Sequence, residues 1–176
     1  MKNEGLADIL SERNLALHGS YLEDWRLKFS VLAKSGYDIM GKSPREIFRM
    51  RSLGLAREEI LRASLEVYYH ELYFSSFSKS GTRPASLGTC YSSVGGFLYE
   101  AECLAMSKEG GFLLVFEEPR GALLLHSSDY PRLVRGEPRL AVDLSEHAYF
   151  LDYAFDKRAY LRAALSRLDL SRMDKI

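Results

Sequence analysis

The spacing of apolar residues changes halfway along the chain, and this change limits the folds open to it. In the first half, apolar residues recur mostly every three or four positions, as on one face of a helix: Leu10, Leu15, Leu17, Tyr21, Leu22, Trp25, Phe29 and Leu32. In the second half, short apolar runs lie at 112–116, 122–126 and 139–142, and the first two flank a turn-rich segment. We therefore expect an α+β protein whose helices precede a three-stranded antiparallel sheet.

Local signals predict where the helices begin and end. One long helix is predicted from Leu6 to Leu32, with Ser11 as a candidate cap, and Ser43-Pro44 is typical of a helix start. Further helices are predicted near 56–77, at 86–107 with a break or bend near Gly95-Gly96, from Asp143, and at 157–168. We expect two domains: a helical hairpin at 1–84 and an α+β domain at 85–176.

Charge and composition argue against several classes of protein. The chain has 24 basic and 24 acidic residues with interspersed signs, so it lacks the basic stripe of a nucleic-acid-binding protein. No window approaches the run of about 18 apolar residues that suggests a membrane span. Cys90 and Cys103 are the only cysteines, and both are expected to be small buried apolar residues. The first ten residues have no signal-peptide pattern, so we expect a soluble, reduced, cytoplasmic protein.

Three of the four histidines lie on apolar helical faces, at His18, His70 and His147. Asp143 precedes His147 by four residues, which places both side chains on one helical face. One interpretation is an ordinary side-chain pair that stabilises the helix. The alternative joins these four residues into a site with three histidines and one carboxylate, which suits Fe, Mn or Zn. The spacing leaves both interpretations open.

Longer stretches add a resemblance to a known family. Residues 143–153, DLSEHAYFLDY, resemble the D-x-W-E-H-A-Y-Y-x-x-Y signature of iron/manganese superoxide dismutases, and the similarity continues without a gap to about Met173. Residues 10–18 resemble the family's I-S-x-x-T-L-x-x-H helix, and residues 67–74 its V-W-N-H-x-x-Y-W segment. The segment 111–123 stands where the family has its G-W-x-W-L-V hairpin. The resemblance thus covers nearly the whole chain.

The resemblance implies a fold, an activity and a set of site residues. It implies a helical hairpin followed by a metal-binding α+β domain, and one Fe or Mn ion per chain held by His18, His70, Asp143 and His147. Such a site would dismutate superoxide, a small anion, to oxygen and hydrogen peroxide. In the family, the glutamate at Glu146 contacts a ligand histidine of a partner subunit, so a homodimer is expected. Nucleic acid and membranes are not expected partners.

The chain also departs from the family pattern in the surroundings of the site. Leu22 and Arg26 stand at the positions of the family's gateway His and Tyr, and Arg26 is a cation that could attract an anion. The chain has no Gln to hydrogen-bond a metal-bound solvent, which leaves His126 as a candidate substitute. Three family tryptophans are replaced, by Phe74, Phe112 and Ser145. An alternative function is therefore a superoxide-dismutase-like protein that binds a metal or small ligand without useful dismutation.

Overall fold

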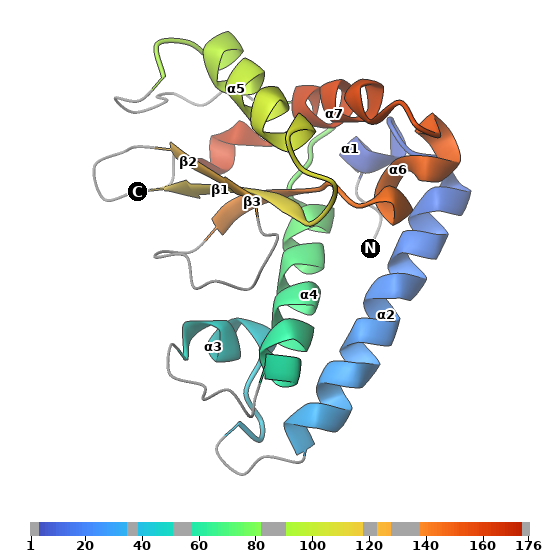
Figure 1. The fold of residues 1–176 in the computed structure, drawn as a ribbon, viewed down its shortest axis with the longest axis vertical. Coiled ribbons are helices and arrows are strands. Elements are labelled where there is room, and N and C mark those ends of the chain that lie inside the picture. Colours follow the sequence, from blue (N-terminus) through green and yellow to red (C-terminus); the bar gives the residue numbers. More distant parts are fainter. Residues whose placement is uncertain are drawn as a thin grey trace.

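The structure is a computed structural model, and it describes residues 4–34, 39–50, 58–81, 91–117, 123–127 and 138–173. Its first half contains four helices: α1 (Glu4–Ala7), α2 (Glu12–Lys34), α3 (Pro44–Arg49) and α4 (Glu58–Ser75). The two long helices, α2 and α4, pack side by side (Figure 1). The predicted single helix from Leu6 to Leu32 is wrong, because a short helix, α1, precedes α2 and the two are separate.

The candidate cap at Ser11 and the helix start predicted at Ser43-Pro44 are both confirmed. The Ser11 hydroxyl accepts a hydrogen bond from the Asn14 amide at the start of α2. At the start of α3, the Ser43 hydroxyl accepts from the Glu46 amide while the Glu46 carboxylate accepts from the Ser43 amide. This reciprocal pair satisfies amides that have no partner within the helix itself.

The second half begins with α5 (Val94–Met106) and contains one antiparallel sheet. Its strands are β1 (Phe112–Glu117), β2 (Leu123–Ser127) and β3 (Pro138–Asp143), in the order β2-β1-β3. Phe112 pairs with Asp143, and Leu114 pairs with both His126 and Ala141. The predicted α+β class and its three-stranded antiparallel sheet are confirmed.

Helices surround the sheet and complete one apolar core. Helix α4 packs against β3, while α5 packs against β1 and β2 and also against α7 (Lys157–Ser166) (Figure 1). Helix α6 (Glu146–Tyr153) lies between β3 and α7 in the sequence and contacts both α2 and α7. A 3-10 helix, η2 (Leu170–Met173), follows α7. Buried side chains from both halves of the chain form a single cluster. Because α4 and β3 pack together, side chains from the first and second halves of the chain can contact one another.

One prediction for α5 is wrong, and another falls partly outside the described residues. The helix begins at Val94, so Gly95 and Gly96 lie in its first turn, and residues 86–90 of the predicted helix are not among those described. The Ser93 hydroxyl caps this turn by accepting from the Gly96 amide. Cys103 lies on the exposed side of α5 and is not buried, whereas Cys90 falls outside the described residues. Among the described helices, none is both long and apolar enough to cross a membrane.

Candidate metal centre

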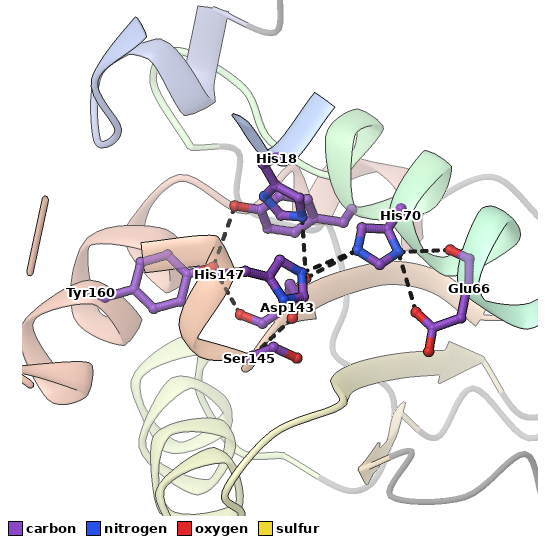
Figure 2. Close-up of polar contacts among 8 residues, drawn as sticks. His18, Glu66, His70, Asp143, Ser145, His147 and Tyr160 are labelled. Atoms are coloured by element: carbon purple, nitrogen blue, oxygen red, sulfur yellow. Dashed lines mark hydrogen bonds and ion pairs between the residues drawn. The ribbon is translucent and has the colours of Figure 1, made fainter. Parts of the chain in front are cut away.

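Four elements bring the four predicted side chains to one point. His18 comes from α2, His70 from α4, Asp143 from the end of β3, and His147 from the first turn of α6 (Figure 2). One ligand atom from each residue lies within 4.8 Å of all the others. Among the described residues, this is the one group of three or more His, Cys, Asp or Glu side chains with such a spacing.

The imidazole nitrogens converge on a single carboxylate oxygen. Asp143 Oδ2 lies 3.2 Å from His18 Nε2, 3.4 Å from His70 Nε2 and 3.0 Å from His147 Nε2. The Nε2 atoms of His70 and His147 are 3.4 Å apart. Zn²⁺ binds imidazole nitrogen at about 2.1 Å, and two ligand atoms at that distance lie about 3.0–3.6 Å apart for angles of about 90–120°. The observed separations therefore suit a common transition-metal ion.

Unsatisfied polar atoms provide an independent test of this fit. Within the described part of the chain, His18 Nε2 and Asp143 Oδ2 are buried and make no contact with hydrogen-bond geometry, although they are neighbours. Buried polar atoms without hydrogen bonds cost free energy and are rare in folded proteins. A cation bound by these lone pairs would satisfy them, and three imidazoles with one carboxylate are suitable donors for Fe, Mn or Zn. The residues present thus fit a bound metal ion.

Neighbouring backbone groups orient two of the four side chains. His70 Nδ1 lies 2.7 Å from the Glu66 carbonyl oxygen, so Nδ1 donates there and Nε2 is left to face the cluster. The Ser145 amide donates to Asp143 Oδ1 at 2.9 Å, which turns Oδ2 toward the histidines. The Tyr160 hydroxyl donates to the Asp143 carbonyl at 2.9 Å, and this anchors the end of β3 (Figure 2).

The cluster also shifts the pKa values of its members. Burial raises the pKa of Asp143, but the imidazoles of His147, His18 and His70 outweigh burial and hold the pKa well below its usual range. Burial, together with the neighbouring His70 and His147, lowers the pKa of His18 by more than Asp143 raises it. Burial also lowers the pKa of His70, yet Asp143 and the Glu66 carbonyl raise it further, so the net shift is upward. An ionised Asp143 and a neutral His18 are the forms that bind a metal.

Aromatic rings form the walls of the cluster. The rings of Tyr73 and Phe74 lie 4.9 and 5.0 Å from the His18 ring, and the Phe112 ring lies 4.9 Å from the His70 ring. Two of the positions where the family has tryptophan therefore still carry an aromatic side chain against a histidine. The Tyr21 ring lies 4.2 Å from the His147 ring.

The structure gives Arg26 a different role from that of an anion-attracting cation. Its guanidinium donates to the Glu71 carboxylate at 2.8 Å and also pairs with Glu23. These contacts tie α2 to α4 and surround the positive charge with two carboxylates. Arg26 is therefore poorly suited to attract an anion to the metal centre.

Glu66 is a neighbour of the cluster that the sequence analysis missed. Its carboxylate Oε2 lies 3.7 Å from His70 Nδ1, and the side chain is largely buried. Burial raises the pKa of Glu66. The signal was present in the sequence, because Glu66 precedes His70 by four residues, the spacing that singled out Asp143 and His147.

For His126 and Glu146, which were predicted to lie near the metal, the structure gives the position in the fold but no contact with the cluster. His126 lies on β2 opposite Leu114, but its side chain falls outside the described part of the chain, so its role stays a prediction. Glu146 lies exposed in the first turn of α6, directly before His147. An exposed position leaves its carboxylate accessible to a partner subunit.

Comparison with known proteins adds evidence that is independent of this geometry. Residues 85–175 match the family of iron/manganese superoxide dismutases, C-terminal domain. A curated relative from Cupriavidus metallidurans, named Superoxide dismutase [Fe], is 33% identical over 128 residues. The match covers 68% of this chain and 64% of the relative, so the chain spans less than two thirds of that protein's length. The chain belongs to the iron/manganese superoxide dismutase family.

Proposed function

We propose that this protein dismutates superoxide to oxygen and hydrogen peroxide at a mononuclear site for Fe or Mn. The ligands would be His18, His70, Asp143 and His147, with one ion per chain. The observation that carries the proposal is the convergence of three imidazole nitrogens on one buried carboxylate oxygen. The relative's name, Superoxide dismutase [Fe], supports iron, although both metals suit these donors.

The charges of the ligands favour a small anion as the substrate. Three neutral imidazoles and one carboxylate contribute one negative charge, which leaves excess positive charge on a divalent or trivalent ion. When bound, Fe or Mn would supply the one-electron reduction and oxidation that dismutation requires. The residues of the chain hold the ion, exclude water on the side of Tyr73, Phe74 and Phe112, and leave the side of His147 open to solvent.

Metal analysis combined with an activity assay tests this proposal. Protein purified without added metal should contain one Fe or Mn per chain, and His70→Ala should contain little. Loaded wild type should dismutate superoxide, but more slowly than a family member that carries the gateway residues and a side-chain amide, because losing one such donor typically costs about 100- to 1000-fold. Equal metal in wild type and His70→Ala would contradict the ligand assignment.

The second candidate function is metal or ligand binding without useful dismutation. The absence of Gln and the residues Leu22 and Arg26 at the gateway positions favour it. Fully loaded wild type without metal-dependent activity would support this candidate. If His126 has replaced the amide, His126→Ala should lower activity and leave the metal content unchanged.

We also propose a cytoplasmic homodimer in which the start of α6 lies at the interface. Glu146 is exposed beside His147, and Phe150, Leu151 and Phe155 expose apolar side chains nearby, with Phe155 87% exposed. The match of residues 85–175 supports a domain boundary near residue 84. Sedimentation should show a dimer that Glu146→Ala weakens, and a monomeric wild type would contradict the dimer.

A further inference from the structure

The two buried histidines on α2 and α4 are held in different ways. The His70 imidazole has a partner on each side, because its Nδ1 lies 2.7 Å from the Glu66 carbonyl oxygen while its Nε2 faces the cluster (Figure 2). His18 also turns Nε2 toward the cluster, but its Nδ1 is buried and has no hydrogen-bond partner within the described part of the chain. A histidine that binds a metal through Nε2 carries a proton on Nδ1 and almost always donates it to an acceptor. His18 therefore requires an acceptor for its Nδ1 proton.

Asn14 lies where such an acceptor is needed. It precedes His18 by four residues on α2, as Glu66 precedes His70 on α4, and it is completely buried. Side chains four residues apart lie on one face of a helix, and each side chain is tilted toward the start of the helix. The His18 imidazole is therefore inclined toward the turn that carries Asn14.

Asp152 fixes the direction in which the Asn14 amide faces. Asn14 Nδ2 lies 3.0 Å from Asp152 Oδ2, and an ionised carboxylate accepts hydrogen bonds but donates none. The amide nitrogen must therefore face Asp152, and Asn14 Oδ1 faces away from it. Asn14 Oδ1 is buried, and no donor among the described residues reaches it.

The unpaired atoms of Asn14 and His18 are complementary. The described residues contain five buried side-chain nitrogen or oxygen atoms without a hydrogen bond: His18 Nδ1 and Nε2, Asp143 Oδ2, Asn14 Oδ1 and Ser78 Oγ. A metal ion would satisfy His18 Nε2 and Asp143 Oδ2. A hydrogen bond from His18 Nδ1 to Asn14 Oδ1 would satisfy two more of these atoms and remove the free-energy cost of leaving them unpaired. The two atoms form no hydrogen bond in the structure, so this contact requires a rotation of the imidazole.

We propose that Asn14 is the positioning residue of His18, with Asn14 Oδ1 accepting a hydrogen bond from His18 Nδ1 while His18 Nε2 binds the metal. This inference rests on the proposed metal-binding function. Asp152 holds the amide in the required orientation, so an exposed carboxylate on α6 acts on a buried ligand through one amide. Such a hydrogen bond fixes the tautomer and the ring orientation of a histidine and strengthens its bond to the metal.

The test compares two variants of Asn14. Asn14→Leu removes both polar atoms at nearly the same size, whereas Asn14→Asp keeps an oxygen that can accept from His18. Ser64→Ala is the matched control, because Ser64 is equally buried and its hydroxyl donates to the Pro44 carbonyl on α3. The proteins are loaded with Zn²⁺, which suits these donors and has no unpaired electrons, and NMR of the imidazole nitrogens follows the Nδ1 protons of His18 and His70.

Both Nδ1 protons should exchange slowly with water in wild type. In Asn14→Leu the His18 proton should exchange faster, while the His70 proton, which the Glu66 carbonyl accepts, should be unchanged. Asn14→Asp and Ser64→Ala should keep both protons slow. Asn14→Leu should also lose metal to a chelator about tenfold faster than wild type, as removal of a group that holds a ligand commonly does.

Each other outcome has a definite meaning. An unchanged His18 proton in Asn14→Leu would overturn the proposal, and so would an Asn14→Asp variant that behaves like Asn14→Leu. Faster exchange of both the His18 and the His70 proton in Asn14→Leu would also overturn it, because that result indicates general loosening. If Asn14→Leu does not fold by circular dichroism, Asn14→Ala replaces it with the same expectations.

A wild type that binds no metal contradicts the proposed function instead. The role of Asn14 is then tested on metal-free protein, where the chemical shifts of the ring nitrogens give the fraction of His18 that carries its proton on Nδ1. This fraction should be lower in Asn14→Leu than in wild type, and equal fractions would overturn the proposal.

Discussion

The candidate metal centre has two unlike sides. Its inner side comprises His18, His70 and Asp143, which are buried and packed against the rings of Tyr73, Phe74 and Phe112. Its outer side comprises His147, which is partly exposed beneath Tyr21 and continues into the exposed face of α6. The difference indicates that the inner side determines whether an ion is held, while the outer side determines what reaches it.

The largest effect on metal binding is expected from two separate variants, each of which removes one proposed ligand, the first on the inner side and the second on the outer side. Asp143→Asn takes away the only charged ligand, so metal content should fall below detection. His147→Ala leaves three inner ligands and an opening that water can fill, so it should weaken binding about 100-fold or more without abolishing it. Elemental analysis and chelator competition measure both variants. Complete loss of metal in His147→Ala would break the distinction between the two sides.

A second comparison concerns the stability of the metal-free protein. Phe112 is buried against His70 and Tyr69, so Phe112→Ala should leave a cavity and lower the free energy of unfolding by about 3–5 kcal/mol. Leu151 lies on the exposed face of α6, and in protein diluted until the proposed dimer has dissociated, Leu151→Ala should change this free energy by less than about 0.5 kcal/mol. Denaturant unfolding measures both values. If both variants lowered the free energy of unfolding by a similar amount, the outer side would be packed as tightly as the inner side.

The smallest effect tests how the two sides are joined. Asp152 on α6 accepts hydrogen bonds from the Ser11 amide at 2.9 Å and from Asn14 Nδ2 at 3.0 Å, which links the helix of His147 to that of His18. Asp156 caps α7 by accepting from the Ala159 amide at 2.9 Å. Asp152→Ala and Asp156→Ala should each lower the free energy of unfolding by about 1 kcal/mol.

Only Asp152→Ala should also speed metal loss to a chelator, because only Asp152 connects two ligand-bearing helices. Thermal unfolding followed by the chelator assay separates the two effects. Equal rates of metal loss in both variants would mean that the link between α6 and α2 does not support the centre.

Helix starts show where sequence reasoning succeeds. Ser11 was recognised as a candidate cap, and Ser43-Pro44 as a helix start because proline suits the first helical position; in both cases the signal lies within one short segment. The predicted helix from Leu6 failed because its apolar spacing continues across Ser11. The Asp152 contact that helps to begin α2 at this point comes from a residue 141 positions away.

The candidate centre was predicted only in part. The spacing left the site of His18, His70, Asp143 and His147 as one of two open interpretations, and the family resemblance then favoured it. The spacing of Glu66 and His70 carried the same signal but was not used. The positions of Tyr21 over His147, and of Arg26 between Glu23 and Glu71, could not be predicted, because each depends on how separate elements pack.

The sequence by itself therefore determined the α+β class and two helix starts, and it singled out the four residues of the candidate centre. These follow from periodicity, from short-range hydrogen bonds and from motif similarity, all of which are properties of contiguous segments. The tertiary structure alone decided that His147 is the exposed member of the candidate centre, that Glu66 adjoins His70 and that the Tyr21 ring packs against the His147 ring. Exposure and ring contacts depend on the packing of α2, α4, β3 and α6 against one another, and no single segment encodes that packing.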